Sequence, residues 1–127
     1  MITVGYDASS TLSPRGGGIA RYTLELLRAL VEQDAPDFEF VVLLNSLRGI
    51  PDERHQFLFD SPRMGVVRRQ VPGPMLVESW QRVHRPSWGV LTRERCDLVH
   101  APASYIPPAD CPVLVTVHDL GFLRDTE

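Results

Sequence analysis

The sequence contains no lysine, so all 13 of its basic residues are arginine. This absence excludes a lysine nucleophile, Schiff-base chemistry and the lysine of a phosphate-binding P-loop. The codon bias of a GC-rich genome explains the absence more simply than a functional choice does.

Cysteine is scarce as well, because the chain has only two, Cys96 and Cys111. Two cysteines do not make a disulfide framework. Each begins an apolar run, so we expect small, buried apolar side chains rather than a catalytic thiol. Histidine and cysteine do not follow a metal-ligand spacing either: Cys96 and His100 stand at opposite ends of one expected strand, ~13 Å apart at ~3.3 Å per residue.

Long hydrophobic runs and an excess of positive charge are both missing. Apolar runs such as residues 40–44 are far too short to cross a bilayer. The chain opens without the basic start and long apolar stretch of a signal peptide. Its formal net charge of −3 gives no support to nucleic-acid binding. We therefore expect a cytoplasmic protein, either free or peripheral at the inner face of the membrane.

Short apolar runs alternate along the chain with segments of helical periodicity. This alternation predicts a single α/β domain, a Rossmann-like parallel sheet with helices on both faces. Residues 47–62 predict a loop plus a short helix, and Pro86 is expected to kink or divide the second long helix. The expected strands are residues 2–6, 38–44, 64–71, 98–101 and 113–117, and the expected long helices are residues 19–33 and 75–95.

Two expected strands end in polar side chains suited to chemistry. The strand at residues 113–117 leads directly into His118 and Asp119, and the strand before it ends at His100. Ligands of parallel α/β sheets gather at the carboxyl ends of the strands. His118 could then bond a substrate or act as an acid or base. Alternatively His118 and Asp119 only cap the strand end and the turn, and a structural role is favoured for His100.

A run of three glycines, Gly16 to Gly18, precedes the first expected helix. Its free N–H groups and the positive end of the helix dipole could hold an anion. It is not a dinucleotide fingerprint, because Arg21 stands where G-x-G-x-x-G needs its third glycine. The alternative is a flexible surface turn. Asp7, at the end of the first strand, either binds a ligand hydroxyl or only fixes this glycine loop.

Large aromatic and basic residues favour structural roles. Trp80 and Trp88 lie eight residues apart, which predicts a shared core face rather than a platform for nucleic-acid bases. We expect the arginines of the middle of the chain to form solvated faces, not a nucleic-acid patch; these are Arg63, Arg68, Arg69, Arg82 and Arg85.

Taken together, four segments resemble the N-terminal domain of the family-4 (group 1) retaining glycosyltransferases, which have the two-domain GT-B fold. The specificity lies in the order and spacing of the segments rather than in any one of them. They are residues 5–8 (GYDA), 17–27 (GGIARYTLELL), 97–102 (DLVHAP) and 111–123 (CPVLVTVHDLGFL).

This resemblance implies transfer of a sugar, with retention, from a nucleotide-diphosphate sugar to a glycan, lipid or small-molecule acceptor, without metal or further cofactor. The N-terminal domain of such enzymes mostly holds the acceptor. Their glycine loop approaches the donor diphosphate and the acceptor, which implies these roles for Gly17 and Gly18. Their histidine contacts the donor sugar near the reacting centre, which marks His118 as catalytic. The remaining expected substrate or donor ligands are Asp7, Arg21, His100 and Asp119.

The family places basic groups for the diphosphate and a paired glutamate motif in a C-terminal domain, and this sequence contains neither. We therefore expect residues 1–127 to be a truncated acceptor-side domain, the incomplete N-terminal half of a GT-B fold. Such a piece would need the C-terminal domain of the same protein for turnover. It would also expose a sheet edge through which two copies pair. The alternative is a non-catalytic α/β module that pairs with a separate domain or chain.

Overall fold

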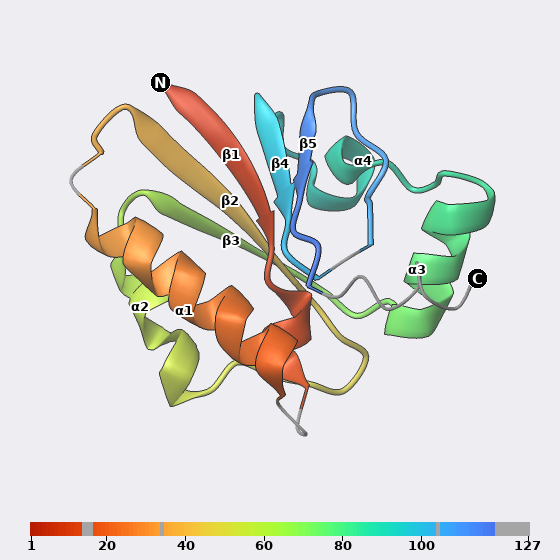
Figure 1. Cartoon of the computed structure of the whole chain (residues 1–127), viewed down its shortest axis with the longest axis horizontal. Helices are drawn as coiled ribbons and strands as arrows, with labels where there is room; N and C mark the ends of the chain where they lie inside the picture. The colour runs from red at the N-terminus through yellow and green to blue at the C-terminus, as the bar shows by residue number, and fades with distance from the viewer. Residues whose placement is uncertain (14–16, 34, 104, 119–127) are drawn as a thin grey trace.

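A parallel five-stranded sheet with the strand order β3-β2-β1-β4-β5 forms the centre of the computed structural model (Figure 1). The structure describes residues 1–13, 17–33, 35–103 and 105–118. The predicted parallel α/β architecture is confirmed. The strands are β1 (Ile2–Asp7), β2 (Phe38–Asn45), β3 (Met64–Arg69), β4 (Leu98–Ala101) and β5 (Val113–Val115).

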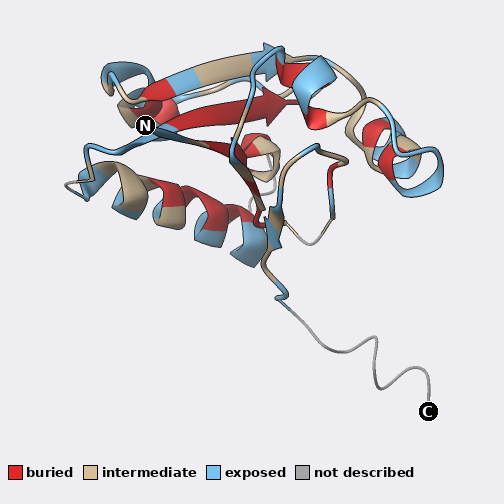
Figure 2. Ribbon diagram, turned by 90° about the horizontal axis from the view of Figure 1, so that it is seen from above, coloured by how far each residue is buried: buried red, intermediate tan, exposed pale blue. Residues whose placement is uncertain are grey.

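Helices cover both faces of the sheet, as predicted (Figures 1 and 2). Helices α1 and α2 pack on one face and α3 and α4 on the other. The described helices are the 3-10 helix η1 (Ser9–Leu12), α1 (Gly18–Glu32), the 3-10 helix η2 (Glu53–His55), α2 (Gln56–Asp60), α3 (Gly73–Arg82) and α4 (Trp88–Thr92). None of them is long and apolar enough to span a membrane.

Alternation along the strands divides the interior into two cores. Successive side chains of a strand point to opposite faces, so Val42 packs on the α1 side and Leu43 on the α3 side. The α1-side core includes Val4, Tyr6, Leu27, Phe40, Val42 and Leu58. The α3-side core consists of Leu43, Leu76, Trp80, Trp88, Leu91 and Val99, with Cys96 and Cys111 partly buried against it.

Three segments show how the observed elements compare with the sequence-based expectation. The polar stretch after Asp7 forms η1, which no periodicity indicated. The helix expected over residues 75–95 is divided around Pro86, as predicted, so Trp80 and Trp88 reach one core from two helices. The last strand ends at Val115 rather than at residue 117. Pairing stops there because β4 ends at Ala101, whose carbonyl accepts the last bond, from Thr116 N–H at 3.2 Å.

Two arginines expected on solvated faces instead bond to the backbone. The Arg63 guanidinium donates to the carbonyls of Val31, Gln33 and Ala35 at 2.7–2.9 Å. These carbonyls lie in and just after the last turn of α1, where a cation also opposes the negative end of the helix dipole. Arg69 donates from Nε to the Leu91 carbonyl at 2.8 Å and so connects β3 to α4.

The first testable prediction concerns Gly5, over which the Trp88 indole packs. A Cβ at Gly5 would lie 2.7 Å from Trp88 Nε1 and 2.8 Å from Cε2. We expect Gly5→Ala to lower the free energy of unfolding by about 1–3 kcal/mol, because overpacking forces the indole or the strand to shift. Urea unfolding measures this loss. Gly65→Ala is the matched control, since its Cβ would lie 3.6 Å from the nearest atom, and equal losses in both variants would contradict the prediction.

Candidate functional site

The strand order creates a switch point between β1 and β4. From β1 the chain moves toward β2 on one side, whereas from β4 it moves toward β5 on the other. Their connections diverge at the carboxyl ends, and this divergence is the usual place for a ligand in open α/β sheets.

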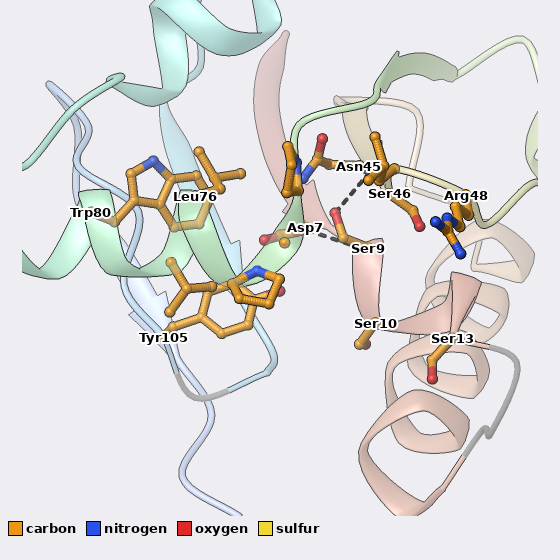
Figure 3. A pocket seen from close by; sticks show the side chains of 15 residues that line it. Asp7, Ser9, Ser10, Ser13, Asn45, Ser46, Arg48, Leu76, Trp80 and Tyr105 are labelled. Atoms are coloured by element: carbon orange, nitrogen blue, oxygen red, sulfur yellow. Dashed lines mark hydrogen bonds between the residues drawn. The ribbon is translucent and has the colours of Figure 1, made fainter.

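A cavity of about 520 Å³ opens at this edge, on the α3 side (Figure 3). Its polar residues come from the end of β1, from η1 and from the end of β2 and the turn after it. Its apolar residues come from α3 and the residue before it, from the loop between β4 and β5, and from Leu47 in the turn after β2. Leu76, Trp80 and Tyr105 lie at one end, and Ser46 and Arg48 lie at the other.

Asp7 lies between the two ends of the cavity and is only 2% exposed. Its Oδ1 accepts a hydrogen bond from Ser9 N–H at 3.0 Å, and the hydroxyl of Tyr105 also donates to it. Burial raises the pKa of Asp7 above its usual range, and the bonds from Ser9 and Tyr105 oppose that rise. Burial likewise raises the pKa of Tyr105, so its hydroxyl keeps its proton. Asp7 is therefore a fixed acceptor for a hydroxyl group.

The aromatic end of the cavity is held in place by its own contacts. The rings of Trp80 and Tyr105 pack at 5.8 Å between centroids with a 41° angle between planes. Trp80 Nε1–H donates to the Pro86 carbonyl at 2.9 Å, so the indole has its polar group satisfied. Such a rigid wall suits the apolar face of a ring.

The glycine loop lies outside this cavity, at the N-terminus of α1. Gly17 has φ 113°, a conformation that side chains other than glycine rarely adopt, and its carbonyl accepts the Arg21 N–H at 3.0 Å. A Cβ at Gly17 or at Gly18 would meet no atom within 4 Å. A second hollow, of about 490 Å³, includes both glycines together with Arg21 and Arg54. Gly16 lies outside the described residues.

His118 is exposed and lies against α1. Its ring meets that of Tyr22 edge to face, with centroids 4.9 Å apart and planes at 84°. Its Nε2–H donates to the Pro102 carbonyl just beyond β4. Nδ1 is thus the nitrogen left for a substrate. Asp119 lies outside the described residues.

His100 lies on β4 with its ring on the α1 side. It packs edge to face on Tyr6, with centroids 5.2 Å apart, and its Nε2 lies 3.1 Å from Thr116 Oγ1. Burial lowers the pKa of His100, so the ring is neutral near pH 7.

The structure thus divides the predicted site residues between two sides of the sheet. Tyr6 and Asp7 are adjacent on β1 and therefore point to opposite faces. Asp7 faces the α3-side cavity. The others lie on the α1 side; they are Gly17, Gly18, Arg21, His100 and His118.

A buried histidine that the sequence did not single out fixes the loop between β1 and α1. His55 is 0% exposed; its Nδ1 accepts Asp52 N–H at 3.1 Å and its Nε2–H donates to Thr11 Oγ1 at 2.9 Å. The Thr11 hydroxyl in turn donates to the Ala8 carbonyl at 2.6 Å. The bond that Nδ1 accepts from Asp52 requires a neutral imidazole, because protonation would occupy that nitrogen. Burial lowers the pKa of His55, although Asp52 opposes the shift.

Sequence reasoning also missed Tyr105 and Arg48, which line the α3-side cavity. Arg48 follows the strand that ends at Asn45, and the rule that sites form after strands could have found it. Tyr105 lies in a loop of prolines and alanines, and no local signal shows that it reaches back to Asp7. Among the described residues, no group of three or more histidine, cysteine, aspartate or glutamate side chains could hold a metal ion.

Residues 16–126 match the model of one protein family, described as Glycosyltransferase Family 4. No curated protein and no solved structure matches the chain significantly. The matched range contains the glycine loop and both histidines of the α1 side, whereas Asp7 precedes it.

We predict that protonation of His55 destabilises the fold. Because its pKa in the folded chain is lowered from 6.5, the unfolded chain binds a proton first as the pH falls. The contribution of His55 to stability is therefore complete above about pH 6.5 and declines below it. Urea unfolding between pH 7.5 and 5 should show a smaller loss of stability in His55→Gln. Part of the pH dependence should remain, because the pKa of His100 is lowered as well.

His84→Asn is the control for this prediction. His84 is exposed and has φ 56°, a conformation that asparagine tolerates. The pH dependence of His84→Asn shows what loss of an exposed imidazole does, and His55→Gln is compared with it. An unchanged pH dependence in His55→Gln would show that the buried imidazole does not titrate in this range.

Proposed function

The chain belongs to Glycosyltransferase Family 4, and we propose that it forms the acceptor-side wall of an enzyme that transfers a sugar from a nucleotide-diphosphate sugar to an acceptor hydroxyl with retention. One observation carries this proposal: in a domain of this family, a cavity with a buried carboxylate opens at the carboxyl edge of the sheet. A volume of about 520 Å³ lies in the range of small-molecule sites.

In this proposal the acceptor occupies the α3-side cavity. Its reacting ring packs on Trp80 and Tyr105, and Asp7 accepts a hydrogen bond from one of its hydroxyls. The buried carboxylate is suited to this role because its orientation is already fixed by Ser9 and Tyr105. An orienting group that needs no rearrangement brings the acceptor oxygen close to the donor at little entropic cost.

The donor diphosphate lies at the N-terminus of α1 in the same proposal. There the N–H groups of a 15-residue helix point outward, and Gly17 and Gly18 leave open space for close approach. Arg21 adds a positive charge to this hollow. When the bond from the anomeric carbon to the diphosphate breaks, these groups stabilise the negative charge on the leaving oxygens.

His118 binds the donor sugar through Nδ1, and His100 and Asp119 complete the donor side. The nucleotide itself is held by a C-terminal domain of the same protein, without which we expect no turnover. No metal or further cofactor is part of the proposal, nor is nucleic acid a partner. We place the reaction in the cytoplasm, at the inner face of the membrane where the acceptor is a lipid.

His118→Ala tests the donor side, assayed together with the donor-binding domain. We expect kcat to fall about 10²-fold, the lower range for loss of a positioned catalytic side chain. The fold should be retained because the His118 side chain is exposed. His84→Asn serves as the control for loss of an exposed imidazole, because asparagine tolerates its φ of 56°. Turnover equal to that of the unmodified enzyme would remove His118 from the mechanism.

A pair of glycine variants tests the phosphate-binding role of the loop. Gly17→Ala places a side chain at φ 113°, which should cost about 1–3 kcal/mol of stability. Gly18→Ala adds a methyl group in open space at the start of α1, so stability should not fall. If the diphosphate approaches this backbone, the Gly18 variant still loses donor affinity. Full affinity in Gly18→Ala would reduce the loop to a surface turn.

A further inference from the structure

The α3-side cavity has an asymmetric charge distribution. Asp7 and Arg48 are the ionisable acid and base among its described lining residues, apart from Tyr105. Asp7 is buried between the two ends of the cavity, whereas Arg48 is exposed at one end. The open end of the cavity therefore presents a cation to a ligand.

The turn that carries Arg48 is firmly seated. Gly49 N–H donates to Ser46 Oγ at 2.8 Å, which closes the turn from Ser46 to Gly49. The backbone of Gly49 packs so closely on η1 that a Cβ there would lie 2.6 Å from the Leu12 carbonyl oxygen. Arg48 thus projects from a fixed position. Figure 3 shows Ser46 and Ser13 at the same end of the cavity.

The N-terminus of α3 adds to the positive potential of the cavity. Pro72, Gly73 and Pro74 all line it, and the first bond of the helix runs from Leu76 N–H to the Pro72 carbonyl. This ten-residue helix has no side-chain cap and no acidic residue in its first turn. The positive end of its dipole is therefore unopposed by a side chain of that turn.

We infer that the α3-side cavity selects an acceptor that carries a phosphate: a sugar or polyol whose ring packs on Trp80 and Tyr105 while its phosphate binds Arg48. Guanidinium groups and hydroxyls are among the side-chain groups that recognise phosphate in proteins. The aromatic residues and Arg48 lie at opposite ends of the cavity, so different residues recognise the ring and the phosphate. This inference rests on the proposed function, because it names the class of acceptor for the same cavity.

Amide NMR shifts of this chain at low ionic strength test the inference with four probes: methyl glucoside, glucose 6-phosphate, inorganic phosphate and uridine diphosphate. We expect glucose 6-phosphate to shift the signals of Asp7, Arg48 and Tyr105 and to bind at least tenfold more tightly than methyl glucoside. Arg48→Gln should abolish that tenfold preference. Arg95→Gln, a change to an exposed arginine outside the cavity, should retain it.

Other outcomes overturn the inference in distinguishable ways. Equal affinity for methyl glucoside and glucose 6-phosphate at the cavity would refute phosphate selection and leave the acceptor pocket in place. Inorganic phosphate binding as tightly as glucose 6-phosphate would show that the ring is not recognised. If uridine diphosphate shifts the signals of the cavity residues more than glucose 6-phosphate does, the phosphate bound there belongs to the donor. If no sugar shifts these signals, the acceptor pocket of the proposed function itself fails.

Discussion

The rest of the structure depends on the hydrogen-bonded ladders on both sides of β1. This strand pairs in parallel with β2 along its whole length and with β4 over residues 4–6. Gly5 lets the Trp88 indole lie directly on the strand. Helix α4 therefore packs close to the sheet and covers part of its α3-side face. Because β1 is the middle strand, any shift of its register would displace both cores and the carboxyl edge together.

The end of β1 also decides how the two substrates are arranged in the proposed enzyme. Tyr6 points toward α1 and packs on His100, while Asp7 points into the cavity beside α3. Under the proposed function, the donor-side and acceptor-side groups lie on opposite faces of one strand end. The sugar must cross the carboxyl edge between them, and His118 lies on the α1 side of that edge beside Pro102.

Side chains from distant segments hold the loops of this edge in place. The Asn45 amide donates to the Val71 carbonyl at 3.0 Å and accepts Val71 N–H at 2.9 Å, which fixes the exit from β3. Asn45 N–H also donates to Ser9 Oγ at 2.9 Å, and Ser9 in turn donates to Asp7. With His55 on Thr11, these bonds organise the loops before any ligand binds, which lowers the entropic cost of binding.

The sequence by itself determined the parallel α/β fold, the approximate positions of the five strands and the division of the second long helix. It did so because apolar runs and helical periodicity are local properties. It also indicated polar residues at the end of β1 (Asp7) and near the end of β4 (His100), whereas β5 ends at Val115, before His118. Only the tertiary structure decided that Asp7 faces a different side from the histidines, and that Tyr105 and Arg48 share its cavity. Those contacts join residues up to 98 positions apart, as between Asp7 and Tyr105, and depend on the direction of each side chain at its strand end, which no local pattern encodes.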